Sequence, residues 1–241
     1  MPQFSYFWAI NSDMYKFVLL FLPWIVFSQS NFEKGETLFN QKKYEEANVY
    51  FEAYLKVKPN DSKTIEYLGD IAGYYKKWDE AMVKYKSLRD RFPNNANYHY
   101  KYGGAMGMKA KGSNKFKALG MIDEIEDSFK TAAKLDPKHT DTRWALVILY
   151  LELPAIVGGS EKKAQFYADE LMVISKIDGY MAKGHIDEYF ERYVSAEKYY
   201  LKGVQLTRSK TAYQRLINLY KKMNLPHKVK IAQEESDTYN N

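Results

Sequence analysis

From residue 31 onward, apolar residues recur three and four positions apart in short stretches that polar breaks separate. This spacing is typical of amphipathic helices. The first stretch contains Gly35 and Leu38, and the next runs from Tyr44 to Leu55. A Lys-Pro-Asn-Asp break follows at 58–61, where proline cannot continue a helix and Asn and Asp favour turns and N-caps. The pattern predicts antiparallel helices in pairs, the first over 31–59 and the second over 62–93.

The pattern repeats with a fixed step. Gly35, Gly69 and Gly103 stand 34 residues apart. A small residue at such a position lets two helices approach closely, and a large aromatic residue fills the space beside it. A constant period of this length is typical of a solenoid of helix pairs. The same step separates Tyr44 from Trp78, Ala47 from Ala81, Phe51 from Tyr85, and Pro59 from Pro93.

These residues resemble the tetratricopeptide repeat (TPR) family. The family pattern of a large apolar residue, Leu-Gly, an aromatic residue, Ala, a second aromatic residue and Pro is matched by Ile65, Leu68, Gly69, Trp78, Ala81, Tyr85 and Pro93. The match covers 31–103. The resemblance implies an all-α, right-handed superhelical solenoid of antiparallel helix pairs over 31–241, with about five to six repeats.

Beyond Gly103 the repeat loosens. The third unit closes at Asp136-Pro137, and its closing proline stands 44 residues after Pro93, so this unit holds ten extra residues. A fourth unit is predicted from Thr140, with a second helix from Ser160 to about residue 175. In the fifth, Lys183 and Asp187 occupy positions where apolar residues are expected. A more polar last pair, 211–223 and the helix after 226, fits a terminal cap.

Two insertions depart from the repeat, near 104–117 and 153–160. The first is rich in glycine and lysine, and no acidic residue stands between Tyr98 and Ile122. It is either a lengthened helix hairpin with solvated lysines or a site for an anion or a membrane surface, which would use Lys109, Lys111, Lys115 and Lys117. The second, Pro-x-x-x-Gly-Gly-Ser, predicts a tight turn with Ser160 as a helix cap, and an anion site at the helix start is the alternative. It also resembles an insert in some exported bacterial TPR proteins.

The N-terminal residues 1–30 read as a signal peptide. Eleven apolar residues, Phe17 to Phe27, follow Lys16, a length suited to the apolar region of a secretory signal. Cleavage is expected after Ser28, and Met14 is a candidate for the true start. We therefore expect export, to the periplasm. The alternatives are an uncleaved signal that anchors the chain in the membrane and an apolar first helix packed on the solenoid.

Composition adds mainly exclusions. The chain has no cysteine, which excludes disulfides, thiolate metal sites and a cysteine nucleophile. The net charge is only +6, and the 36 basic residues are scattered among 30 acidic ones, so nucleic acid is not expected as a partner. The four histidines form no metal-binding pair, and no catalytic or cofactor motif is present, so we predict no enzyme activity, no metal and no cofactor. His185 with Asp187 and Glu188 is interpreted as a surface triplet, and the acidic run from Asp123 to Asp127 as a solvated face.

The resemblance implies a groove lined by the first helix of each pair, which holds an extended peptide or a partner helix. Aromatic rings with Asn and Asp suit such a partner, because they bury side chains and bond an extended backbone. We therefore predict a non-enzymatic scaffold for a protein or peptide. Membrane-surface contact through the lysine insert and glycan binding by exposed tyrosines are the alternatives. Nothing in the sequence specifies an oligomeric state. The implied groove residues, some of which are open to packing roles instead, are Glu36, Phe39, Asn40, Lys63, Glu66, Asp70, Tyr74, Asn97, Tyr100 and Lys101.

Overall fold

The computed structural model describes residues 31–240. The predicted signal peptide and the candidate start at Met14 lie outside these residues. Two compact units make up the chain, one ending at Leu88 and the other beginning at Arg89. Within 31–240 every regular element is helical. No helix in this range is both long enough and apolar enough to cross a membrane.

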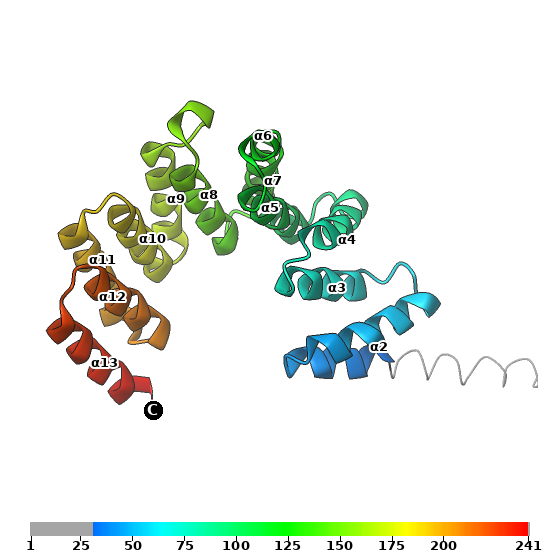
Figure 1. Cartoon of the computed structure of the whole chain (residues 1–241), viewed down its shortest axis with the longest axis horizontal. Coiled ribbons are helices and arrows are strands. Elements are labelled where there is room, and N and C mark those ends of the chain that lie inside the picture. Colours follow the sequence, from blue (N-terminus) through cyan, green and yellow to red (C-terminus); the bar gives the residue numbers. More distant parts are fainter. Residues whose placement is uncertain (1–30, 241) are drawn as a thin grey trace, which may run out of the picture. The chain divides into compact units, whose positions relative to one another are not determined.

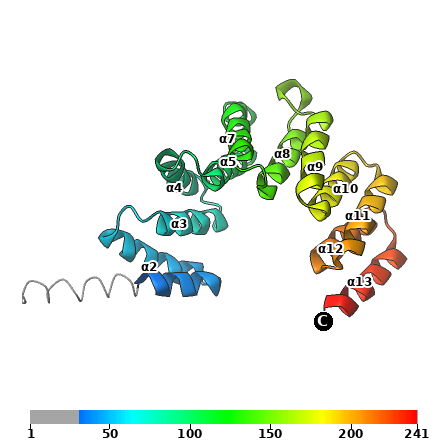
Figure 2. The same cartoon turned by 180° about the vertical axis from the view of Figure 1, so that it is seen from behind.

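The helices of the described chain form six successive pairs, as the repeat predicts. The first unit holds a helix over 31–40, then α2 (Tyr44–Val57), α3 (Ser62–Tyr74) and the greater part of α4 (Trp78–Arg91). The second unit continues with α5 (Ala96–Lys111), α6 (Lys115–Leu119), α7 (Ile122–Leu135), α8 (Thr140–Glu152), α9 (Glu161–Ile174), α10 (Lys176–Tyr189), α11 (Tyr193–Thr207), α12 (Lys210–Lys222) and α13 (Pro226–Asn240). In that unit α8, α10 and α12 share one side, and α9, α11 and α13 share the other (Figures 1 and 2).

Glycine and an aromatic ring meet inside several pairs, which explains the period seen in the sequence. A Cβ added at Gly69 would lie 2.5 Å from Cε1 of Tyr85, and one added at Gly184 would lie 2.5 Å from Cε1 of Tyr200. Gly35 faces Phe51 in the same way. These glycines are therefore required by close packing of the two helices rather than by backbone conformation.

Four of the turns inside pairs are closed by the same backbone bond. In the turn before α4, the amide of Lys77 donates to the carbonyl of Ala72 at 2.8 Å, after Lys76 at a φ of 57°. The turn before α11 repeats this arrangement, with Glu191 at a φ of 57°. Such a bond satisfies the last carbonyls of a helix and fixes the angle at which the next helix leaves. The corresponding left-handed residues of the first and last turns are Lys42 and Asn224.

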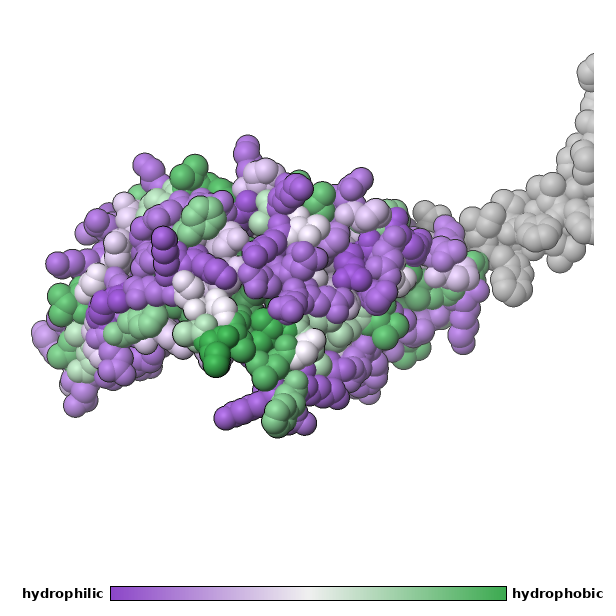
Figure 3. Space-filling model, turned by 90° about the horizontal axis from the view of Figure 1, so that it is seen from above, coloured by the Kyte–Doolittle hydropathy of each residue, from purple (hydrophilic) through white to green (hydrophobic). Residues whose placement is uncertain are grey.

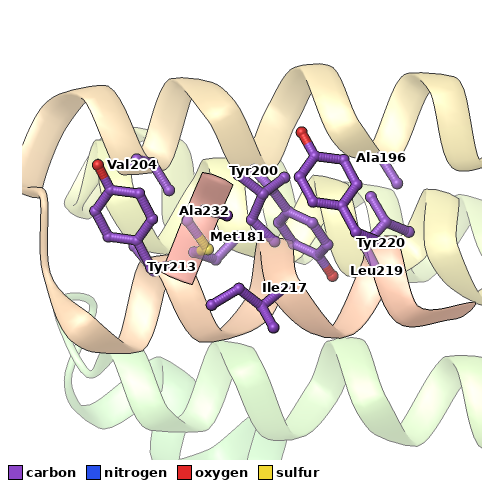
Figure 4. Close-up of a cluster of buried hydrophobic side chains, with 11 residues drawn as sticks. Met181, Ala196, Tyr200, Val204, Tyr213, Ile217, Leu219, Tyr220 and Ala232 are labelled. Atoms are coloured by element: carbon purple, nitrogen blue, oxygen red, sulfur yellow. The ribbon is translucent and has the colours of Figure 1, made fainter. Parts of the chain in front are cut away.

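The apolar core of the second unit is best defined at its C-terminal end. Tyr200 of α11 and Leu219 of α12 are fully buried there, and Met181 of α10 and Ala232 of α13 close the cluster (Figure 4). The predicted polar last pair is confirmed as α12 and α13, yet α12 buries one complete side against α11 and α13.

Both insertions leave the pairing of helices intact. The first lengthens α5 to Lys111 and adds the short helix α6, while Gly103 still meets the ring of Phe129. The second forms a single turn at Ala155–Val157, followed by Gly158 at a φ of 99°. The amide of Lys163 donates to the Ser160 hydroxyl at 3.3 Å, so the predicted turn and cap are confirmed.

Candidate functional site

The predicted groove residues fall in both units, and each group is described within its own unit. In the first unit they come from the helix over 31–40 and from α3. In the second they come from α5. The first helix of each pair supplies all of them, as the resemblance implied.

An ion pair joins two of the predicted residues in the first unit. The ammonium of Lys63 lies 2.6 Å from Oε1 of Glu36, and the hydroxyl of Tyr67 donates to the same oxygen at 2.8 Å. The hydrogen bond from Lys63, then that from Tyr67, lowers the pKa of the Glu36 carboxyl. Glu36 and Lys63 therefore satisfy each other across two successive first helices, and a ligand would have to compete with that pair.

The other predicted residues of this unit divide between packing and exposure. The ring of Phe39 lies 4.7 Å from that of Tyr67, so it packs between repeats, and Asp70 accepts a hydrogen bond from the Tyr85 hydroxyl at 2.6 Å. Tyr74 keeps 62% of its surface exposed. Asn40 is exposed, and Glu66 is half-buried.

In the second unit Tyr100 packs against the following repeat. Its ring centroid lies 5.1 Å from that of His139, directly before α8, and burial, then the charge of Asp141, raises the pKa of the Tyr100 hydroxyl. Asn97 and Lys101 are half-buried on the same helix. Their role in binding stays a prediction.

Three successive first helices of the second unit bring together a set of residues that the sequence analysis did not group. Trp144 of α8 donates from Nε1 to Asp178 of α10 at 3.1 Å. The ring of His185, also on α10, lies 6.3 Å from the Trp144 ring. The Arg215 guanidinium of α12 lies 5.6 Å from the same Trp144 ring. All four side chains are half-buried. We call Trp144, Asp178, His185 and Arg215 the Trp144 face.

The electrostatics of the Trp144 face favour a neutral histidine beside a permanent cation. Burial, followed by repulsion from Arg215, lowers the pKa of the His185 imidazole. A neutral imidazole can both donate and accept a hydrogen bond, and a guanidinium can pair with a carboxylate through two parallel bonds. The indole supplies an apolar surface next to both. The face can therefore hold a polar, extended chain that carries a carboxylate.

Tyrosine hydroxyls, carboxylates and cations recur as triads between neighbouring helices. Tyr200 of α11 donates to Glu188 of α10 at 2.7 Å, and Lys222 of α12 lies 2.6 Å from the other oxygen of that carboxylate. Burial alone would raise the pKa of Glu188, but the hydrogen bonds from Lys222 and Tyr200 outweigh it and the pKa is lowered. We call these triads tyrosine clasps. The others are Tyr67–Glu36–Lys63, Tyr102–Glu124–Arg89, Tyr150–Glu126–Lys130 and Tyr220–Glu197–Lys228.

The clasps correct the interpretation of the acidic run as one solvated face. Asp123 and Asp127 are exposed, but the Glu126 side chain is only 17% exposed and accepts a hydrogen bond from Tyr150 at 2.6 Å. Glu124 accepts from Tyr102 at 2.8 Å. Glu126 is therefore a structural carboxylate, while Glu124 stays exposed and bonds a neighbouring helix.

The interpretation of His185, Asp187 and Glu188 as a surface triplet is also wrong. Asp187 is buried, accepts from Nε of Arg192 at 2.8 Å and bonds the Ser195 hydroxyl, while Glu188 belongs to a tyrosine clasp. Asp187 therefore ties α10 to the start of α11, which explains an acidic residue at an apolar position of the repeat. Within 31–240, no group of three His, Asp or Glu side chains is placed to hold a metal ion.

Arg143 is a second charged residue with a structural role that the sequence analysis missed. It is buried in α8, donates to the carbonyls of Asp136 and Ala133 at 2.7 and 3.0 Å, and pairs with Glu170 of α9 at 3.2 Å. It thereby caps the end of α7 and links three helices. Its signal in the sequence is a charge within a strongly apolar helix.

One lysine of the first insertion is held in an ion pair. The ammonium of Lys111 lies 2.6 Å from Glu152, at the end of α8. Lys115 and Lys117 lie exposed on α6, and Lys109 is half-buried at the end of α5. Anion binding by these lysines stays a prediction.

Solved structures identify the arrangement of the helices. No protein-family model matches the chain, and no curated protein matches it. A thermophilic TPR protein of Thermus thermophilus aligns with a TM-score of 0.66 at 17% identity, over 80% of this chain and 98% of that one. The chain has the tetratricopeptide-repeat fold.

Two further TPR-like structures agree with this fold. A tetratricopeptide repeat protein of Parabacteroides merdae aligns with a TM-score of 0.59 at 14% identity, over 88% of this chain and 79% of that one. The pilF protein of Pseudomonas aeruginosa aligns with a TM-score of 0.58 at 14% identity, over 88% and 91%. The predicted all-α solenoid of helix pairs is therefore confirmed.

Proposed function

We propose that this TPR protein is a non-enzymatic scaffold that binds a protein or peptide partner on the first helices of its repeats, and that it is exported to the cell envelope. The Trp144 face supports the proposal most directly. It combines an indole, a neutral imidazole and a guanidinium on three successive first helices. Trp and Arg are also the residues that most often dominate the energetics of protein interfaces.

The chemistry of this face defines the partner further. An extended segment with an acidic residue would pair its carboxylate with Arg215 and lay an apolar neighbour on Trp144. His185, neutral because its pKa is lowered, would bond the peptide backbone. The partner is therefore expected to present an acidic residue next to an apolar one in an unfolded or extended segment.

Capture of partners from an envelope extract tests the proposal. The bait is the parent chain beside a Trp144→Ala/Arg215→Gln variant, with Val173→Ala/Val194→Ala on the second helices as the matched control, because Val173 and Val194 are exposed and lie outside the Trp144 face. A protein retained by parent and control but lost by the Trp144 variant, with circular dichroism unchanged, supports the proposal. Equal recovery by all three baits would exclude this face as the binding surface.

Export is tested separately by sequencing the N-terminus of the chain isolated from cells that express it. The run from Phe17 to Phe27 followed by Ser28 supports a mature chain that begins at Gln29. A chain recovered from the cytoplasm with residues 17–28 still attached would contradict export.

A further inference from the structure

Beyond partner binding on the first helices, we infer that the two insertions of the second unit together form a docking surface for an anionic phospholipid membrane. The surface consists of α6 and the turn at 153–157, with the lysines that flank them. It lies at the loop ends of α5 and α8 and does not include the Trp144 face.

An ion pair brings the two insertions together. Lys111 lies in the first insertion and ends α5, and Glu152 ends α8, directly before the second insertion. Their charged groups lie 2.6 Å apart, although 41 residues separate them in the sequence. Both departures from the TPR repeat therefore lie at the same end of the second unit.

Each insertion presents a large apolar side chain to solvent. Phe116 of α6 is 89% exposed, and Ile156 in the turn before α9 is 93% exposed. Neither α6 nor the turn Ala155–Val157 buries a single side chain, so packing within the described chain does not account for them. Figure 3 looks onto this end and shows apolar side chains gathered over α6 and the 153–157 turn, with hydrophilic residues around them.

The charge around these two side chains is positive. The first insertion contains four lysines, of which Lys111 is paired with Glu152, and no acidic residue, and Lys162 and Lys163 follow the second insertion. The nearest carboxylates of the second insertion are paired, Glu152 with Lys111 and Glu161 with Arg192. Glu124, near the start of α7, is held by Tyr102 and Arg89.

Protruding apolar side chains within a ring of lysines suit a lipid surface better than a protein groove. The lysines attract the negative potential of anionic lipids, and the apolar side chains enter the boundary between headgroups and acyl chains. Phe116 and Ile156 both lie in short connections between longer helices, Phe116 in α6 and Ile156 in the turn before α9. The positive charge and the two exposed apolar side chains, Phe116 and Ile156, together favour an anionic bilayer as the partner of this surface.

Single labelled cysteines test this inference in the full chain, which has no cysteine of its own. An environment-sensitive fluorophore is placed at Phe116→Cys, at Ile156→Cys and at the control Val173→Cys. Val173 is 88% exposed and lies about 18 Å along α9 from the first residue of that helix. All three chains keep the same N-terminal apolar segment, so any membrane attachment through that segment affects them equally.

We expect a blue shift and a gain in intensity at positions 116 and 156 with vesicles that contain phosphatidylglycerol. Position 173 should not respond, and pure phosphatidylcholine vesicles should have no effect. Lys115→Gln/Lys117→Gln should weaken the apparent affinity about 25-fold, at about fivefold for each lysine. The control Lys198→Gln/Lys221→Gln should leave it within about twofold.

Several outcomes would overturn the inference. An equal response at position 173, or an equal response to neutral vesicles, would show attachment that does not use this surface. A response to poly-glutamate but not to vesicles would assign the surface to an acidic protein. A shift that depends only on protein concentration would assign it to a second copy of the chain.

Discussion

Replacing Gly184 with alanine adds one methyl group where α10 and α11 approach closely. The new Cβ would lie 2.5 and 2.6 Å from Cε1 and Cδ1 of Tyr200. Carbon atoms in contact normally stand about 3.5–4.0 Å apart, so the ring must move by roughly 1 Å. Tyr200 is fully buried, and its hydroxyl is held by Glu188, which in turn is held by Lys222. The ring therefore has no free direction in which to move.

The magnitude follows from two opposed terms. Alanine in place of glycine inside a helix stabilises by about 1 kcal/mol, and overpacking a well-filled core costs about 1–3 kcal/mol. With the ring held, we place the cost near the upper end, about 3 kcal/mol, so Gly184→Ala should lower the free energy of unfolding by about 2 kcal/mol. Gly104 in α5 is the matched control, because an added Cβ there meets nothing within 4 Å. Gly104→Ala should therefore stabilise by about 1 kcal/mol.

Thermal unfolding followed by circular dichroism measures the difference. Both glycines belong to the second unit, so both variants report on the same unit. A gap of about 3 kcal/mol corresponds to roughly 6–12 °C in Tm for a unit of this size. If Gly184→Ala unfolded at or above the temperature of Gly104→Ala, close approach would not be the reason for glycine at this position of the repeat.

Four further outcomes follow from the packing and the charges. Ala81→Leu should cost about 1–3 kcal/mol in chemical denaturation, because Ala81 is fully buried, and an unchanged midpoint would contradict its place in the repeat. Glu188→Ala should cost about 2 kcal/mol by leaving the buried hydroxyl of Tyr200 unpaired, and adding Tyr200→Phe should recover part of that loss; a double variant whose loss equals the sum of the two single losses would contradict the clasp. Because the pKa of Glu188 is lowered in the folded chain, its carboxylate stabilises the fold above pH 4.5, and this stability should be lost as the pH falls through the folded pKa. A denaturation midpoint that stays constant down to about pH 3 would exclude this contribution. Burial, then the hydrogen bond to Glu124, raises the pKa of Tyr102 to about 12. The stability that this tyrosine contributes should therefore be present below pH 10 and lost as the pH rises towards 12. An absorbance titration in which Tyr102 ionises at pH 10 would refute this prediction.

The repeating contacts could be predicted from the sequence because each one is local. Gly69 and Tyr85 stand 16 residues apart within a single helix pair, so the contact recurs wherever the pair recurs. The third pair keeps the contact between glycine and ring as well, because Gly103 meets the ring of Phe129. These two residues stand 26 positions apart rather than 16, since the insertion adds ten residues.

The Trp144 face could not be predicted in the same way, because the spacing of the later first helices is irregular. Their capping residues, Asn95, His139, Ser175 and Ser209, stand 44, 36 and 34 residues apart, so positions carried over by a step of 34 lose their phase. One signal was present: Trp144 and its partner Asp178 stand one full period apart.

The charged residues of the clasps show a different limit. On the surface of one predicted helix, Glu126 looks solvated, and only the neighbouring α8 places the hydroxyl of Tyr150 over it. Asp187 likewise looks misplaced in an apolar position until Arg192 and Ser195 are seen beside it. Sequence patterns identify which side of a helix is apolar, but they do not show which polar side chains a second helix will satisfy.

Site-specific photo-crosslinking tests the proposed scaffold function most directly. Benzoylphenylalanine replaces Trp144 in one chain and Val173 in another, both are expressed in cells, and the products of irradiation are separated by mass. Binding on the first helices predicts a protein adduct at position 144 that is absent at position 173 and absent when Arg215→Gln is added. Equal adducts at both positions, or an adduct at 173 alone, would contradict a partner site on the Trp144 face.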